Sequence, residues 1–185
     1  MDKSTLEELR KLSLSGYGRA NANRIVDAIS QKPDLYKDLF TLFLADEEPV
    51  SRRVVWGLDL YAEIHPEVLL PYLDSIVDHL PGFRHDALKR HSLRMLARSP
   101  LPGNNLGQLI SYCFDVLISP TDPPAVKVHA MEILYRAAQN EPDLKKELID
   151  TIEWRLAESS AGIRSRGEKI LKKLYSERVS RLLGS

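Results

Sequence analysis

The feature that most constrains the fold of this chain is a repeat with a nearly constant period. Four nine-residue segments align without gaps, namely VSRRVVWGL from Val50, LKRHSLRML from Leu88, VKVHAMEIL from Val126 and IRSRGEKIL from Ile163. Their starts lie 38, 38 and 37 residues apart, and a fifth, degenerate copy begins near Tyr17. Self-similarity at a fixed period of this length is the sequence signature of a repeat architecture.

Each repeat is predicted to be a pair of helices. In the aligned segments the first, fifth, eighth and ninth residues are the apolar positions, and these share one face of a helix. We expect leading helices over 17–30, 51–65, 84–98, 127–139 and 163–175 and trailing helices over 34–48, 67–79, 104–118 and 143–158. No segment alternates as a strand would, so the sequence predicts an all-α fold of about nine to eleven helices. The expected core includes Cys113, Ala130, Ile133, Leu134 and Ile152.

The 185 residues are enough for a single domain, 1–185, with repeats over 17–175 and a cap at each end. A helix over 4–15 is the expected N-terminal cap, with Ser4 and Glu7 as a capping box. Residues 176–185 are a C-terminal cap or tail, in which Val179, Leu182 and Leu183 could cover the last repeat. Such caps are needed because an end repeat otherwise exposes its apolar face.

The leading segments follow the pattern Val-[Arg/Lys]-x-x-small-x-x-x-Leu, which resembles the HEAT repeat of ARM-type helical proteins. This resemblance covers about residues 17–175 and implies a right-handed α-α superhelix of four to five helix pairs, with the Val-Arg helices on the concave side. Ser51 and Gly18 depart from the pattern.

A narrower resemblance is carried by Pro49-Val-Ser-x-x-x-Val-Trp56-x-x-Asp59. It is similar to small bacterial helical-repeat proteins that often carry the label adenylosuccinate lyase. The chain has neither a Gly-Ser-Ser-rich signature loop nor a Lys-x-Asn catalytic stretch, so lyase activity ranks last among the functions considered.

The formal net charge is zero, with 26 basic and 26 acidic residues. The chain as a whole therefore has no net positive charge that would attract nucleic acid over long range. The charges are nevertheless segregated, because the leading helices carry +10 and the trailing helices −10. Three basic side chains are expected to form a purely structural ladder of ion pairs with acidic side chains of neighbouring repeats, namely those of Lys89, Lys127 and Arg164. The helix face away from the core is predicted to form a concave binding strip of Arg52, Trp56, Asp59, Arg90, Arg94, Arg98, Tyr135, Arg136, Lys169, Lys172 and Lys173.

A second row, one residue before the small position, is interpreted as a structural ladder that bonds loop carbonyls between repeats. It consists of Arg53, His91, His129 and Arg166. Two histidines without a third ligand do not make a zinc site, so no metal and no cofactor are expected. The single cysteine, Cys113, lies on an apolar stripe and is expected to be a buried thiol. No catalytic motif is present, so no catalytic residue is assigned.

The favoured function is a non-enzymatic scaffold that binds a protein or peptide of acidic character on the concave strip. The alternative is a DNA-binding or DNA-glycosylase-like HEAT protein, in which Trp56 and Asp59 would face the DNA. No apolar run is long enough to span a membrane and no signal peptide is evident, so a cytoplasmic location is expected. The oligomeric state stays open.

Overall fold

The computed structural model describes residues 3–139, 141–156 and 160–183, and every regular element in these ranges is helical. The predicted all-α class is therefore confirmed, with ten α-helices in the described residues. Contacts divide the chain into two compact units, Met1–Pro100 (unit 1) and Leu101–Ser185 (unit 2), each described by itself below. That residues 1–185 form a single domain stays a prediction. Among the described helices, none combines the length and apolar character that crossing a bilayer would need.

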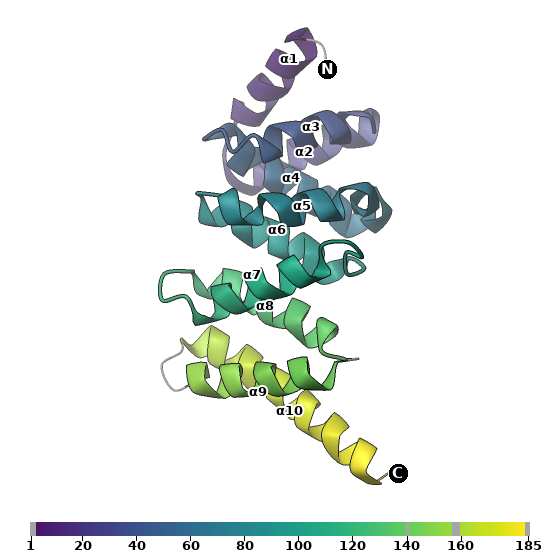
Figure 1. Ribbon diagram of the computed structural model, residues 1–185. Coiled ribbons are helices and arrows are strands. Elements are labelled where there is room, and N and C mark those ends of the chain that lie inside the picture. The colour runs from purple at the N-terminus through teal and green to yellow at the C-terminus, as the bar shows by residue number, and fades with distance from the viewer. Residues whose placement is uncertain (1–2, 140, 157–159, 184–185) are drawn as a thin grey trace. The chain divides into compact units, whose positions relative to one another are not determined.

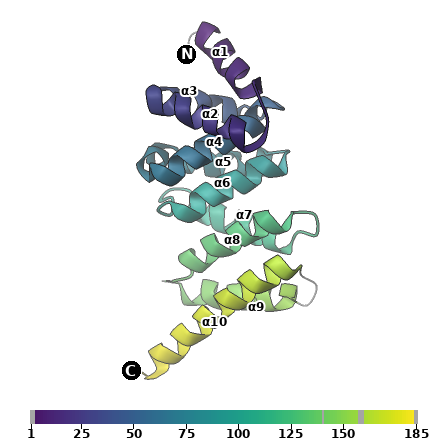
Figure 2. The same ribbon diagram turned by 180° about the vertical axis from the view of Figure 1, so that it is seen from behind.

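Unit 1 is built around one central helix, α4, which packs against α1, α2, α3 and α6. Figure 1 views this unit from the side of α3 and α5, and Figure 2 from the side of α2, α4 and α6. Its elements are α1 (Lys3–Leu14), α2 (Gly18–Gln31), α3 (Leu35–Leu44), α4 (Val50–Ile64), the 3-10 helix η1 (Pro66–Tyr72), α5 (Leu73–His79), the 3-10 helix η2 (Leu80–Gly82) and α6 (Asp86–Arg98).

Unit 2 repeats the arrangement of paired helices. Within it α8 packs against α7, α9 and α10, and α9 also contacts α7 and α10. Figure 1 shows α7 and α9 in front, and Figure 2 shows α8 and α10 in front. Its helices are α7 (Leu106–Ile118), α8 (Pro124–Ala137), α9 (Pro142–Leu156) and α10 (Ala161–Leu183).

The repeat phase predicts the core correctly. All sixteen residues at the four apolar positions of the aligned segments are buried. The five residues named in the predicted core, Cys113, Ala130, Ile133, Leu134 and Ile152, are buried as well. Burial of these faces is the main driving force for stacking one helix pair on the next.

One glycine in each unit allows two helices to approach closely. A Cβ atom added at Gly57 of α4 would lie 2.4 Å from Cγ2 of Ile25 in α2. In unit 2, a Cβ atom at Gly167 of α10 would lie 2.8 Å from Cδ2 of Leu156 in α9. Both glycines belong to the aligned segments, Gly57 at the eighth position and Gly167 at the fifth.

Three details differ from the sequence predictions. Helix α1 already begins at Lys3, so Ser4 lies inside the helix and is not its N-cap. The trailing helix expected over 67–79 starts as the 3-10 helix η1, because Pro71 has no N–H to bond the carbonyl of Glu67. Helix α10 is continuous to Leu183 rather than ending before a separate cap. The side chains of the predicted C-terminal cap, including Val179, Leu182 and Leu183, lie outside the described part.

Candidate binding groove

Unit 1 contains a groove of about 460 Å³ between the start of α2, the first half of α4 and the start of α6. Its lining brings together residues at matching positions of two consecutive repeats, Arg52 and Arg53 from α4 with Arg90 and His91 from α6. The other lining residues are Tyr17, Gly18, Asn21, Trp56, His85, Asp86 and Ala87. Arg52, Trp56 and Arg90 of the predicted strip therefore meet in one groove, together with two members of the predicted ladder.

The lining is strongly basic. Three arginines face one carboxylate, that of Asp86, and no lysine lines the groove. The Nδ1 atom of His85 accepts a hydrogen bond from the backbone N–H of Ala87 at 3.0 Å, so this imidazole caps the first turn of α6. The groove thus carries three guanidinium groups against one carboxylate, a balance that favours anions.

A chain of hydrogen bonds connects Arg90 to the interior. Its Nη2 atom lies 3.2 Å from Nε2 of His91, and the Nδ1 atom of His91 lies 2.7 Å from Oδ2 of Asp59. Because a guanidinium only donates, Nε2 of His91 accepts, and Nδ1 carries the proton that it donates to Asp59. The buried carboxylate thereby fixes the imidazole, and the imidazole positions Arg90 at the groove.

Asp59 itself does not face the groove, and its assignment to the binding strip is wrong. The residue is 0% exposed, and besides His91 it accepts hydrogen bonds from Arg94, at 2.9 Å, and from Arg98. Both arginines also pair with Glu63, at 2.7 and 3.4 Å. Asp59 is buried because its helix, α4, has neighbours on more than one side. A carboxylate in this position cannot approach a DNA base, which removes the residue that the glycosylase alternative required.

Two aromatic side chains flank the basic groups. Tyr17, just before α2, is 82% exposed, and the guanidinium of Arg53 lies 5.0 Å from the centre of its ring. Trp56 is half-buried and stacks on His91 with ring centroids 6.1 Å apart. The Trp56 ring thus packs on a neighbouring helix and also lines the groove.

Sequence reasoning did not assign Tyr17 to a site. The available signal was that Tyr17 opens the degenerate fifth repeat and precedes Gly18, whose φ of 60° lies in the left-handed region that favours glycine. This backbone turn directly before α2 accompanies the placement of the Tyr17 side chain in the lining of the groove.

The strip residues of unit 2 are described separately. On α10, the exposed side chains of Lys169, Lys172 and Lys173 line a shallow hollow of about 360 Å³, with Arg166, Ile170 and Ser176. The ladder residue Arg166 pairs with Glu132 at 3.3 Å. His129 and Arg136 are half-buried.

Tyr135 of the predicted strip is part of an interhelix cluster. Its hydroxyl donates to Glu177 at 2.8 Å, and Glu177 also pairs with Lys145 at 2.7 Å. The ammonium of Lys173 lies 5.0 Å from the centre of the Tyr135 ring. Burial, followed by the hydrogen bond to Glu177, raises the pKa of Tyr135 to about 12. These contacts join α8, α9 and α10.

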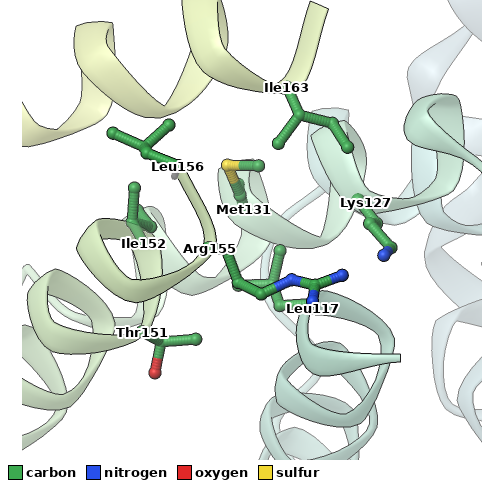
Figure 3. A pocket seen from close by; sticks show the side chains of 8 residues that line it. All are labelled: Leu117, Lys127, Met131, Thr151, Ile152, Arg155, Leu156 and Ile163. Carbon is green, nitrogen blue, oxygen red and sulfur yellow. The ribbon is translucent and has the colours of Figure 1, made fainter. Parts of the chain in front are cut away.

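An enclosed cavity in unit 2 is too small to hold a ligand. Its volume is about 10 Å³, roughly the space of one water molecule. Figure 3 shows Lys127 and Arg155 beside the apolar side chains that line it. Both donate to the carbonyl of Ser119 directly after α7, and burial, together with the charge of Arg155, lowers the pKa of Lys127. This basic pair binds the end of a helix.

Metal and thiol chemistry find no support in the described residues. Within them, no group of three or more His, Cys, Asp or Glu side chains is placed to hold a metal ion. Cys113 is 0% exposed, and burial raises the pKa of its thiol, so the interpretation of Cys113 as a buried thiol is confirmed.

The comparisons with known proteins agree with the helical repeat. The profile of the HEAT repeat domain matches residues 10–174. No curated protein and no solved structure matches this chain.

Proposed function

Because this chain belongs to the HEAT repeat domain family, we propose that it is a non-enzymatic scaffold that binds an acidic segment of a partner protein in the groove of unit 1. The family match establishes a helical repeat scaffold, and such scaffolds commonly mediate protein interactions. The proposal assigns the partner's chemistry and the place where it binds.

The observation that carries the proposal is the composition of the groove. It combines three arginines with Trp56 and Tyr17, and arginine, tryptophan and tyrosine are the residue types most enriched in binding hot spots. An opening of about 460 Å³ admits side chains of an extended segment. Complementary charge on that segment would select acidic partners over basic ones.

The protonation chemistry of the groove supports binding over catalysis. Guanidinium groups keep their protons in proteins and therefore do not act as general acids or bases. Nε2 of His91, which could otherwise take up a proton from a substrate, accepts from Arg90 at 3.2 Å. The buried carboxylate of Asp59 is occupied by three donors.

The test is fluorescence anisotropy with a labelled Glu-rich peptide and a matched Gln-rich peptide. We expect the acidic peptide to bind more tightly, and Arg52→Glu and Arg90→Glu each to weaken it by about tenfold, since charge-assisted contacts contribute at least that much. Lys37→Glu is the matched control, because Lys37 is exposed on α3 and is not among the residues that line the groove. This control should change affinity by less than about twofold.

Two results would contradict the proposal. One is equal binding of the acidic and neutral peptides. The other is tight binding of duplex DNA, with the logarithm of affinity falling steeply against the logarithm of salt concentration, at roughly −0.9 per phosphate contact. Arg94 and Arg98 are unsuitable for this test, because their substitution would disrupt the ion pairs with Asp59.

A further inference from the structure

We propose that the groove of unit 1 recognises a phosphorylated side chain of its partner, that is, a phosphomonoester on a serine, threonine or tyrosine. This inference rests on the proposed function and specifies which acidic group the arginines take.

The first argument is the positioning of the guanidinium groups. Arg90 is held by His91, which is itself fixed by the buried Asp59. Arg53 lies against the ring of Tyr17, and the Nε atom of Arg52 pairs with Glu48 at 3.1 Å. Side chains held in this way lose less conformational entropy when an anion binds, which favours a defined ligand over general charge attraction.

The second argument is the type of cation. All three groups are arginine, whose planar fork donates two parallel hydrogen bonds to one phosphate, whereas lysine acts as a point charge. The exposed basic face of α10 offers the contrast, because Lys169, Lys172 and Lys173 supply most of its charge. Arginine clusters are the usual means of recognising phosphorylated residues.

The third argument is charge balance. With both histidines neutral, the three arginines and Asp86 give the lining a formal charge of +2. A phosphomonoester carries about −1.5 to −2 at neutral pH, whereas a glutamate carries −1. A single phosphorylated side chain therefore matches the charge of the lining residues themselves, whereas a carboxylate compensates about half of it. Glu48, which pairs with Arg52 beside the lining, lowers the local charge to +1, so the excess positive charge lies at Arg53 and Arg90.

The experiment compares matched peptides that share one acidic sequence and differ at one central position, which holds serine, glutamate, phosphoserine or phosphotyrosine. Titration with inorganic phosphate, in competition with the phosphoserine peptide, separates the phosphate group from its peptide. We expect a phosphorylated peptide to bind at least about tenfold more tightly than the glutamate peptide, as one additional charge-assisted hydrogen bond would give. Whichever of the phosphoserine and phosphotyrosine peptides binds more tightly identifies the type of phosphorylated side chain that the groove prefers.

The decisive variant is Arg90→Lys, which keeps the charge and removes the fork. It should abolish most of the preference for phosphate and leave binding of the glutamate peptide within about twofold. Arg90 is exposed, so folding should be retained, and far-ultraviolet circular dichroism verifies this. Lys169→Arg on α10 is the control, and it should change the affinity for neither the glutamate peptide nor the phosphorylated peptides.

The two proposals fail in different ways. Equal binding of the glutamate and phosphorylated peptides, or equal weakening of both by Arg90→Lys, would overturn the phosphate inference and leave the acidic-segment scaffold standing. Failure of every acidic peptide to bind would overturn both. Competition by inorganic phosphate as strong as that of the peptide would assign the groove to a free anion and refute recognition of a phosphorylated partner.

Discussion

Three glycine-to-alanine substitutions probe how closely the helices pack. At Gly57, the new methyl group would lie 2.4 Å from Cγ2 and 2.6 Å from Cβ of Ile25. Carbon atoms in favourable contact are about 3.5–4 Å apart, so α2 and α4 would have to separate by roughly 1 Å. Ile25 is fully buried, and a β-branched side chain in a helix has essentially one rotamer, so it cannot turn away.

The expected free-energy changes follow from two opposing contributions. Alanine in place of glycine inside a helix stabilises by about 1 kcal/mol, whereas overpacking a tight core costs about 1–3 kcal/mol. Because a 2.4 Å contact with a side chain that cannot turn away puts the overpacking cost in the upper part of this range, Gly57→Ala should destabilise unit 1 by about 1–2 kcal/mol. At Gly167 the methyl group would meet the tip of Leu156, which is half-buried and can rotate, at 2.8 Å, and Cγ2 of the buried Ile152 at 3.0 Å. Because these contacts are longer than those at Gly57, the two contributions should partly cancel and Gly167→Ala should be less destabilising than Gly57→Ala. A Cβ atom added at Gly107 would meet no neighbouring heavy atom within 4 Å. Gly107→Ala should therefore stabilise the fold by about 0.5–1 kcal/mol.

Urea denaturation measures the series. The chain has two tryptophans, and Trp154 is exposed on α9, so a Trp154→Phe background leaves Trp56 as the reporter of unit 1. Far-ultraviolet circular dichroism follows both units. The order of stability should be Gly107→Ala above the parent, Gly167→Ala below the parent and Gly57→Ala lowest. If Gly57→Ala were as stable as Gly107→Ala, the close approach of α2 and α4 would be refuted.

Further outcomes are expected at four residues. Asp59→Asn should lower the free energy of unfolding by about 3 kcal/mol, because it breaks a buried ion pair; a loss below about 1 kcal/mol in urea denaturation would refute this. Tyr36→Phe should be neutral or stabilising, since the Tyr36 hydroxyl is buried and without a hydrogen-bond partner among the described residues. Burial raises the pKa of Tyr36, so its contribution is complete below about pH 10 and is lost as the pH rises further; Tyr36→Phe should reduce this alkaline loss in thermal denaturation. Cys113 should react with a thiol reagent only at the rate of unfolding, and rapid labelling of the native protein would contradict its burial. Leu134→Ala should cost about 2–5 kcal/mol in the same denaturation assay, and a cost under about 1 kcal/mol would be inconsistent with full packing.

The helices and the core could be predicted from the sequence because both follow from periodicity. A repeat of 38, 38 and 37 residues fixes the phase of each helix pair, and the 3.6-residue period then assigns one buried face to every copy. Val54, Ser92, Ala130 and Gly167 occupy the same position in four copies, and all are buried although their side chains differ in size and polarity. The position of a residue within the repeat thus predicted its burial better than the type of its side chain would have done.

The location of Asp59 could not be predicted in this way. Periodicity places a residue relative to one apolar stripe, and Asp59 lies on the far side of that stripe. Whether the far side is exposed depends on a neighbouring helix, here α6, whose Arg94 and His91 are 35 and 32 residues away in sequence. The same limit applies to the groove, because Tyr17, Trp56 and Arg90 meet only through packing of α2, α4 and α6.

A net charge of zero therefore says little about what each unit can bind. In unit 1, Arg94 and Arg98 are compensated by Asp59 and Glu63, and Arg52 pairs with Glu48. The available basic character therefore lies in the groove, chiefly at Arg53 and Arg90. In unit 2, the exposed lysines of α10 are strongly hydrated point charges, whose attraction is screened beyond roughly 8 Å in physiological salt. Guanidinium groups that are already oriented select by geometry at contact distance, where screening is weak. Selectivity for a partner would thus arise in unit 1, even though both units carry basic residues on their leading helices.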